Sequence, residues 1–204
     1  MSKVGLINYG SGNYMSVYNA LKYLKINVIE INKKYQLEDV THIILPGVGS
    51  FNSIMDKLKK NDLIDEILNQ LKQGKPYLGI CVGMQILATL GTEFQKTHGI
   101  GYINGNVIKI PAENYNMTLP HIGWNEVEQC NMSPLFLNIE NNASFYFVHS
   151  YYFVPDNKDC IIANCEYGTK ITACVQKENC YGVQFHPEKS QNNGLQLLKN
   201  FVSI

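Results

Sequence analysis

The chain contains no arginine: all seventeen of its basic residues are lysine, and seventeen acidic residues balance them to a formal charge of zero. Without arginine, the protein has no planar guanidinium group to bind phosphate or carboxylate through two parallel hydrogen bonds. Without an excess of positive charge, it also has no electrostatic footprint for nucleic acid or for an anionic membrane. The composition therefore argues against a nucleic-acid-binding or membrane-surface protein.

Long apolar runs and paired cysteine motifs are lacking as well. The apolar stretch Val4 to Ile7 is too short for the core of a signal peptide, and no run approaches the length of a membrane span. The six cysteines contain no C-x-x-C pair and no zinc-ligand spacing. We therefore expect free thiols in a reducing, cytoplasmic compartment, and we expect neither a metal nor a cofactor.

The length of 204 residues, 45% of them hydrophobic, is enough for one well-buried core and too short for two comfortable domains. We therefore expect a single domain over residues 1–204. In the first half, predicted strands alternate with predicted helices. The strands are expected at 4–7, 28–31, 43–45 and 76–80, and the helices at 13–24, 53–71 and 84–90. This alternation predicts an α/β fold with a mainly parallel, doubly wound sheet and functional loops at the carboxyl ends of its strands.

The second half changes character after Gly99. Short strands are expected at 107–110, 126–128, 145–154, 161–164, 172–176 and 182–185, followed by a helix at 194–202. Polar turns separate these strands, which favours an antiparallel extension of the sheet. The chain therefore predicts a parallel sheet with an antiparallel C-terminal extension and a final covering helix.

Cys81 is the most informative residue, because it lies in the segment Gly-Ile-Cys-Val-Gly-Met-Gln directly after a predicted strand. Small residues two positions to either side allow a sharp turn from strand to helix that exposes the side chain. The start of a helix favours a thiolate and can also donate hydrogen bonds to an oxyanion. A buried core cysteine is the alternative, because free cysteine is among the most buried residue types.

A second segment, Gln-Phe-His-Pro-Glu at 184–188, supplies the partners that a cysteine nucleophile needs. In an extended segment His186 and Glu188 point to the same side, and Pro187 between them limits the alternatives. A histidine base oriented by a carboxylate can activate a thiol. Viewed alone, His186 could be a structural histidine and Glu188 a solvated turn residue. Together with Cys81 they predict a catalytic triad.

These two segments resemble the class I glutamine amidotransferase family. Four further segments narrow the resemblance to the glutaminase subunits of imidazole glycerol phosphate synthases, and they lie at 8–13 (NYGSGN), 46–51 (PGVGSF), 120–125 (PHIGWN) and 146–151 (YFVHSY). The resemblance runs from end to end. It implies that Cys81 attacks the side-chain amide of glutamine, His186 protonates the departing ammonia and Glu188 holds the imidazole.

The same resemblance implies roles for other positions. The oxyanion is expected to be stabilised by the backbone of Val82 and of the loop residues Gly47, Val48 and Gly49. Bound glutamine is expected to be held by Gln85, Glu93, His149 and Ser150. Without the family, an ordinary turn at 46–49 and a solvent-exposed Glu93 are the alternatives.

The resemblance also implies a partner, because free ammonia would escape into water. The family solution is a (β/α)₈-barrel cyclase subunit of the HisF type, forming a heterodimer. Positions at or near its interface correspond to Asn13, Ile122, Trp124 and Lys189. Trp124, the only tryptophan, reads either as an exposed anchor or as a core residue.

Two other functions remain open at this stage. One is a paralogue that supplies ammonia to a similar barrel for amidation of a surface-polysaccharide sugar. The other is a non-catalytic relative in which Cys81 senses redox state. The complete set of Cys81, His186 and Glu188 favours the enzyme over the sensor.

Overall fold

A central sheet organises the structure, a computed structural model that describes residues 2–10 and 12–204. Met1 and Ser11, the latter within the predicted 8–13 motif, lie outside the described residues. Within the described part, nine strands form this sheet in the order β2-β1-β3-β4-β13-β12-β11-β8-β9. Their bounds are β1 Lys3–Ile7, β2 Asn27–Ile31, β3 His42–Leu45, β4 Tyr77–Ile80, β8 His121–Gln129, β9 Ala143–His149, β11 Ile161–Glu166, β12 Lys170–Lys177 and β13 Cys180–Val183.

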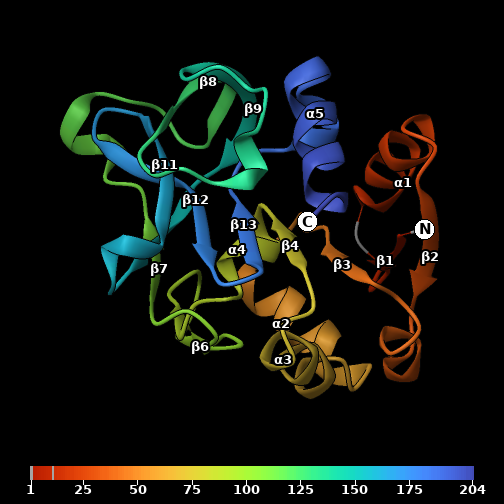
Figure 1. The fold of residues 1–204 in the computed structure, drawn as a ribbon. Helices are drawn as coiled ribbons and strands as arrows, with labels where there is room; N and C mark the ends of the chain where they lie inside the picture. Colours follow the sequence, from red (N-terminus) through yellow and green to blue (C-terminus); the bar gives the residue numbers. More distant parts are fainter. Residues whose placement is uncertain (1, 11) are drawn as a thin grey trace.

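The first half of the sheet is parallel, as the sequence predicts. Strands β2, β1, β3, β4 and β13 all run in the same direction. Every residue of β3 and β4 is buried, which is the pattern of parallel strands covered on both faces. In Figure 1, α1 (Tyr14–Tyr23) and α5 (Gln191–Val202) lie on one side of β3 and β4, whereas α2 (Phe51–Lys60) and α3 (Ile64–Lys72) lie on the other.

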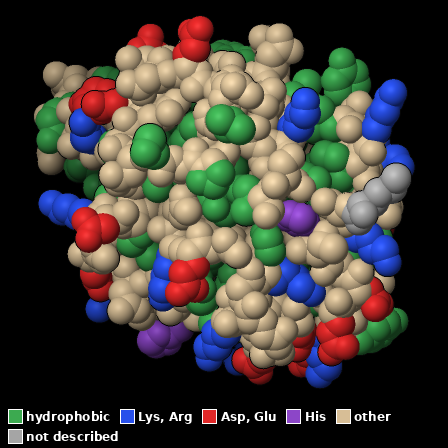
Figure 2. Space-filling view, viewed as in Figure 1, with side chains coloured by type: hydrophobic (Ala, Val, Ile, Leu, Met, Phe, Trp, Pro, Cys, Tyr) green, Lys and Arg blue, Asp and Glu red, His purple; other side chains and the backbone are tan. Residues whose placement is uncertain are grey.

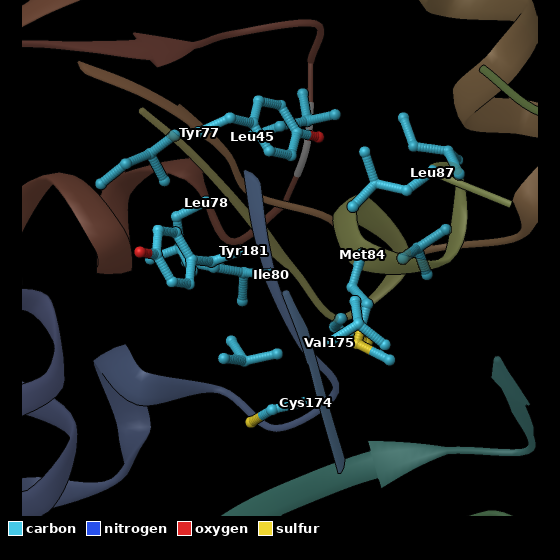
Figure 3. Close-up of a cluster of buried hydrophobic side chains, with 14 of the residues drawn as sticks. Leu45, Tyr77, Leu78, Ile80, Met84, Leu87, Cys174, Val175 and Tyr181 are labelled. Carbon is cyan, nitrogen blue, oxygen red and sulfur yellow. The ribbon is translucent and has the colours of Figure 1, made fainter. Parts of the chain in front are cut away.

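The core is built around β4 and β13. Figure 3 shows buried side chains of these strands and of the segment after β4, among them Tyr77, Tyr181 and Met84. The hydroxyl of buried Tyr77 donates to the carbonyl of Gly83 (3.0 Å), so the one polar atom of this side chain is satisfied. The aromatic core thereby holds the loop that carries Cys81.

The antiparallel extension is also confirmed. Strands β13, β12, β11, β8 and β9 pair antiparallel in turn. In β9 the side chains of Phe145, Phe147 and His149 are buried and alternate with more exposed neighbours, as expected for a sheet with one covered face. The predicted strand at 126–128 is longer in the structure, because β8 begins at His121.

A second sheet was not predicted. It contains β5 Leu90–Gly91, β6 Thr97–His98, β7 Gly105–Lys109 and β10 Tyr151–Pro155, in the order β10-β7-β5-β6. The segment 145–154, expected as one strand, therefore divides at Ser150 into β9 of the large sheet and β10 of the small one. Residues 148–151 therefore span the junction between the two sheets.

Two predicted helices are corrected. The helix expected over 53–71 is divided into α2 and α3, because Asp62 adopts a left-handed conformation (φ 54°) between them. The helix expected over 84–90 is a single turn, α4 (Val82–Gln85). After it the amide of Thr89 donates to Gly105 O (3.0 Å), so pairing with the second sheet replaces helix propagation. The last helix begins at Gln191, three residues before its predicted start.

The surface carries lysines and acidic side chains side by side (Figure 2), in keeping with zero formal charge. No helix within residues 2–10 and 12–204 combines the length and the apolar character needed to cross a membrane.

The final helix makes a testable contribution to stability. Phe201 is fully buried against the rings of His42 and Tyr181, so we expect Phe201→Ala to lower the free energy of unfolding by about 3–5 kcal/mol. Phe94, which is 84% exposed, provides the matched control, and Phe94→Ala is expected to change it by less than about 0.5 kcal/mol. Urea unfolding followed by circular dichroism measures both; similar losses in the two variants would contradict this account of the core.

Candidate active site

Cys81 lies at a sharp backbone turn between β4 and α4, as predicted. Its φ of 54° and ψ of −111° are unusual for a residue other than glycine, and such strain persists only where the surroundings enforce it. The amide of Cys81 donates to Val183 O (2.7 Å), which extends the pairing of β4 with β13 up to the turn. The thiol is buried at 3% exposure and lines a pocket.

Glycines make this turn possible through close backbone contacts. A Cβ on Gly83 would collide with the carbonyl oxygen of Leu45, and one on Gly79 would collide with the carbonyl of Gly83. A Cβ on Gly47 would come 2.6 Å from the amide nitrogen of Gly83. Backbone atoms cannot yield cheaply, so the small residues predicted around Cys81 are required.

His186 and Glu188 form a buried pair on the same side of the chain. His186 Nδ1 lies 2.8 Å from Glu188 Oε1, and both side chains have no exposed surface. Asn13, at the start of α1, donates its Nδ2 to the same carboxylate oxygen (3.1 Å). The carboxylate thus fixes Nδ1 as the protonated nitrogen that faces it.

The other ring nitrogen faces the nucleophile side. His186 and Cys81 both line the pocket, and His186 Nε2 is buried with no hydrogen-bond partner among the described residues. Burial disfavours the charged ring, but the negative charges of Cys81 and Glu188 outweigh it and raise the pKa of His186 to about 10. The site therefore favours a protonated imidazole between a sulfur and a carboxylate.

The pocket itself is small, about 170 Å³, below the ~300–1,000 Å³ of pockets for drug-sized ligands. It suits a ligand of amino-acid size. Besides the nucleophile and base, it is lined by Val48, Gly49, Val82, Gln85, Glu93, Val148, His149, Ser150 and Tyr151.

Three of the four predicted oxyanion residues line the pocket, namely Val48, Gly49 and Val82. Gly49 has a φ of 111°, a conformation that glycine adopts readily. Gly47 is a correction, because it packs against Gly83 beneath the turn instead of lining the pocket. The hydroxyl of Tyr9 donates to Pro46 O (2.8 Å), so loops after β1, β3 and β4 converge here as predicted.

The predicted glutamine-binding residues all line the pocket, but three of them also form hydrogen bonds within the protein through their side chains. Glu93 accepts from the amide of Phe51 (2.9 Å) at the start of α2, which replaces the solvent-exposed alternative. Gln85 donates its Nε2 to Tyr151 O (2.8 Å) and to Gln184 Oε1 (3.0 Å). The amide group of Gln85 is therefore engaged within the protein, and its oxygen is left for other contacts.

His149 is engaged in the same way. Its Nδ1 lies 2.8 Å from Tyr151 O, and its Nε2 lies 3.1 Å from His121 Nδ1. Both ring nitrogens are therefore occupied within the protein, and a contact between glutamine and another part of His149 stays a prediction. Burial lowers the pKa of His149 to about 3 and that of His121 to about 4, so both rings are neutral at physiological pH.

An exposed apolar face begins beside the pocket. It consists of Ile122, Trp124, Tyr146, Val148 and Lys189, which we call the β8–β9 face. Ile122 pairs with Val148 and Trp124 with Tyr146 across the two strands, and Ile122 and Trp124 are 59% and 48% exposed. Lys189 Nζ lies 5.7 Å from the centre of the Tyr146 ring. The reading of Trp124 as a core residue is therefore wrong.

The structure corrects the prediction that Asn13 lies at or near the partner interface. Asn13 is only 4% exposed and orients Glu188, so it cannot form part of a docking surface without movement. Gln184, His121 and Tyr151 were not predicted as site residues. Their signal in the sequence is only their position in the motifs at 184–188, 120–125 and 146–151.

Comparison with known proteins gives a consistent result. A family model described as glutamine amidotransferase class-I matches residues 5–204. The chain is 42% identical to imidazole glycerol phosphate synthase subunit HisH of Pelagibacter ubique, covering 98% of this chain and 99% of that protein. It is 44% identical to the subunit HisH of Leptospira interrogans, covering 98% of this chain and all of that protein.

Solved structures agree on the fold. One described as a glutamine amidotransferase superposes with a TM-score of 0.76 at 20% identity, covering 98% of this chain and 97% of that one. PurLQS from Thermotoga maritima superposes with a TM-score of 0.77 at 19% identity, covering 100% and 99%.

The two neutral histidines predict a pH dependence of stability. In the unfolded chain histidine has a pKa near 6.5, so between about pH 6.5 and pH 4 the unfolded state binds protons that the folded state does not. Stability from this source is complete above pH 6.5 and is lost as pH falls. We expect His121→Gln to reduce the slope of unfolding free energy in this window by about 1 kcal/mol per pH unit.

Urea unfolding at intervals from pH 4 to pH 7 measures that slope. The matched control is His98→Gln, because His98 is exposed, and its slope is expected to equal that of the wild type. A His121→Gln slope as steep as the wild type would show that the buried pair is not held neutral.

Proposed function

The chain belongs to the class I glutamine amidotransferases and, within them, to the HisH subunits of imidazole glycerol phosphate synthase, and on that basis we propose how its site releases ammonia from glutamine. The observation that carries the proposal is Cys81 at a strained turn, sharing one pocket with His186, whose ring is paired with buried Glu188. A thiolate beside an oriented imidazolium is the arrangement that acyl transfer needs.

The reaction begins when Cys81 Sγ attacks the side-chain carbonyl carbon of glutamine. The C–N bond breaks as His186 gives its proton to the departing nitrogen, and ammonia leaves a thioester on Cys81. Water then adds to the thioester carbonyl, with neutral His186 taking its proton. The C–S bond breaks, the sulfur keeps the electron pair, and glutamate is released.

Negative charge develops on the carbonyl oxygen during both steps. Val82 begins α4, where the first amides of a helix have no partner within it, and Val48 and Gly49 line the same pocket. Because α4 is a single turn, we attribute oxyanion stabilisation to individual N–H groups and not to a helix dipole. Tyr9 steadies the Pro46 side of this loop through its hydroxyl.

The ammonia requires a docked acceptor enzyme, because free ammonia would escape into water. We infer a (β/α)₈-barrel cyclase subunit of the HisF type, docked on the β8–β9 face. Val148 belongs both to that face and to the pocket lining, so docking there would enclose the route by which ammonia leaves. The names of the relatives favour this partner over a sugar-amidating one.

We also infer a single domain and a cytoplasmic location. The family model spans nearly the whole chain, which supports one domain. All six cysteines are free thiols in the described structure, which accords with a reducing compartment.

Replacing the nucleophile tests the chemistry. We expect Cys81→Ala to reduce ammonia release from glutamine at least about a thousandfold, because the thioester can no longer form. The assay uses the purified chain with a HisF-type cyclase and its ribotide ligand. Cys130→Ala, at an exposed thiol, is the matched control and is expected to keep full activity. Undiminished ammonia release by Cys81→Ala would refute the assignment.

Replacing the exposed tryptophan tests the docking face. We expect Trp124→Ala to weaken binding of the cyclase subunit by about thirtyfold, since buried tryptophan anchors contribute about 2 kcal/mol or more. Tyr35→Ala is the matched control, because Tyr35 is 66% exposed and follows β2 at the other edge of the sheet. Calorimetric titration gives both affinities; equal Kd values would place the interface elsewhere.

A further inference from the structure

One buried amide touches the nucleophile and takes no part in the mechanism above. Gln184, directly after β13, is fully buried, and its Nε2 donates to Cys81 Sγ at 3.5 Å. Its backbone amide donates to Ala173 O (2.8 Å), which continues the pairing with β12. The side chain thus approaches the sulfur from within the protein, behind the pocket wall.

The backbone carbonyl of Tyr151 determines the orientation of the Gln184 side-chain amide through Gln85. A backbone carbonyl only accepts hydrogen bonds, so the group of Gln85 that faces Tyr151 O (2.8 Å) must be its NH₂. The second hydrogen of that NH₂ faces Gln184 (3.0 Å), which must therefore present its oxygen. The NH₂ of Gln184 is then left to face Cys81, and no choice of amide flip remains.

The other side of the same carbonyl gives a consistent assignment. His149 Nδ1 faces Tyr151 O and must carry a proton, so its Nε2 accepts from His121 Nδ1. His121 Nε2 then accepts from Asn125 Nδ2 (3.3 Å), which also donates to Glu166 O (2.8 Å). Glu166 O, like Tyr151 O, can only accept hydrogen bonds. The donor directions that start from Glu166 O therefore agree with those that start from Tyr151 O.

We propose that Gln184 is a catalytic residue that donates a hydrogen bond to the Cys81 sulfur and stabilises it as a thiolate, with Gln85 as the positioning residue that holds the Gln184 amide in its donating orientation. The inference rests on the proposed role of Cys81 as nucleophile. It assigns the amide of Gln85 to the protein's own network, where the family resemblance had implied only substrate binding.

A donor at this position acts twice in the reaction. Before attack, it favours the thiolate, which is the reactive form. During thioester hydrolysis the C–S bond breaks and the electron pair returns to sulfur, so the same N–H stabilises the leaving group. Charge-assisted hydrogen bonds are stronger than neutral ones, and burial of the amide keeps water from competing with it.

Other titratable groups share the pocket with this sulfur. His186, Glu93 and His149 line the same pocket, and Glu188 acts through His186. All of them remain in a variant that changes only Gln184. A difference between that variant and the wild type therefore reports the amide alone.

The test is the pH dependence of Cys81 alkylation by iodoacetamide, read by mass spectrometry of the Cys81 peptide. We expect Gln184→Met, which keeps the volume and removes the donor, to raise the pH midpoint of alkylation by about one unit. Gln85→Met is expected to shift it in the same direction by less. The matched control is Gln70→Met: Gln70 is 3% exposed and bonds Glu66 on α3, and it is not among the residues that line the pocket. Equal midpoints in Gln184→Met and wild type would overturn the proposal.

A second measurement does not depend on a Gln184 variant folding. In ¹⁵N-glutamine-labelled protein, the side-chain NH₂ signals of Gln184 are expected to shift with pH in step with Cys81 alkylation and to lose that response in Cys81→Ala. A pH response that persists in Cys81→Ala would overturn the proposal. Neither measurement uses free glutamine as a substrate or a partner protein. Absence of glutaminase activity would therefore refute the proposed function without deciding the role of Gln184.

Discussion

The turn at Cys81 is the constraint on which the rest of the site depends. A residue with a side chain is held at positive φ because Gly79, Gly83 and Gly47 bring three backbone segments closer than any Cβ would permit. The aromatic core holds the turn in this conformation, because the hydroxyl of Tyr77 donates to the carbonyl of Gly83. The result is a thiol at the meeting point of loops from β1, β3 and β4, facing a histidine brought in by β13.

Around that turn, hydrogen bonds distribute tasks among residues that are distant in sequence. Glu188 is oriented by Asn13 from the start of α1, and Gln184 by Gln85 from α4. The carbonyl of Tyr151 serves both Gln85 and His149, because the chain leaves the large sheet and enters the small one at this junction. The directions of these hydrogen bonds are consistent from Asn125 through Tyr151 to Cys81.

Sequence patterns were sufficient for the parts of the molecule that depend on local rules. Strands β1 to β4, the glycine-flanked turn and the His186–Glu188 pair each have a spacing that neighbouring residues enforce. The break at Asp62 and the division at Ser150 have no comparable signal, because each is decided by what packs against the segment. Gln184 and Asn13 acquire their roles from contacts 99 and 175 residues away, which periodicity does not report. Asn13 was accordingly assigned to the surface when it belongs to the buried pair.

The placement of the single tryptophan has an optical consequence. Indole emission shifts to shorter wavelength when the ring leaves water, and here only Trp124 supplies that signal. Trp124 is half exposed on the β8–β9 face, where it pairs with Tyr146; the neighbouring cross-strand pair contains the pocket-lining Val148. The chain therefore carries an intrinsic fluorophore at the surface where a partner would dock. Occupancy of that surface is therefore visible in the ultraviolet emission of the unlabelled protein.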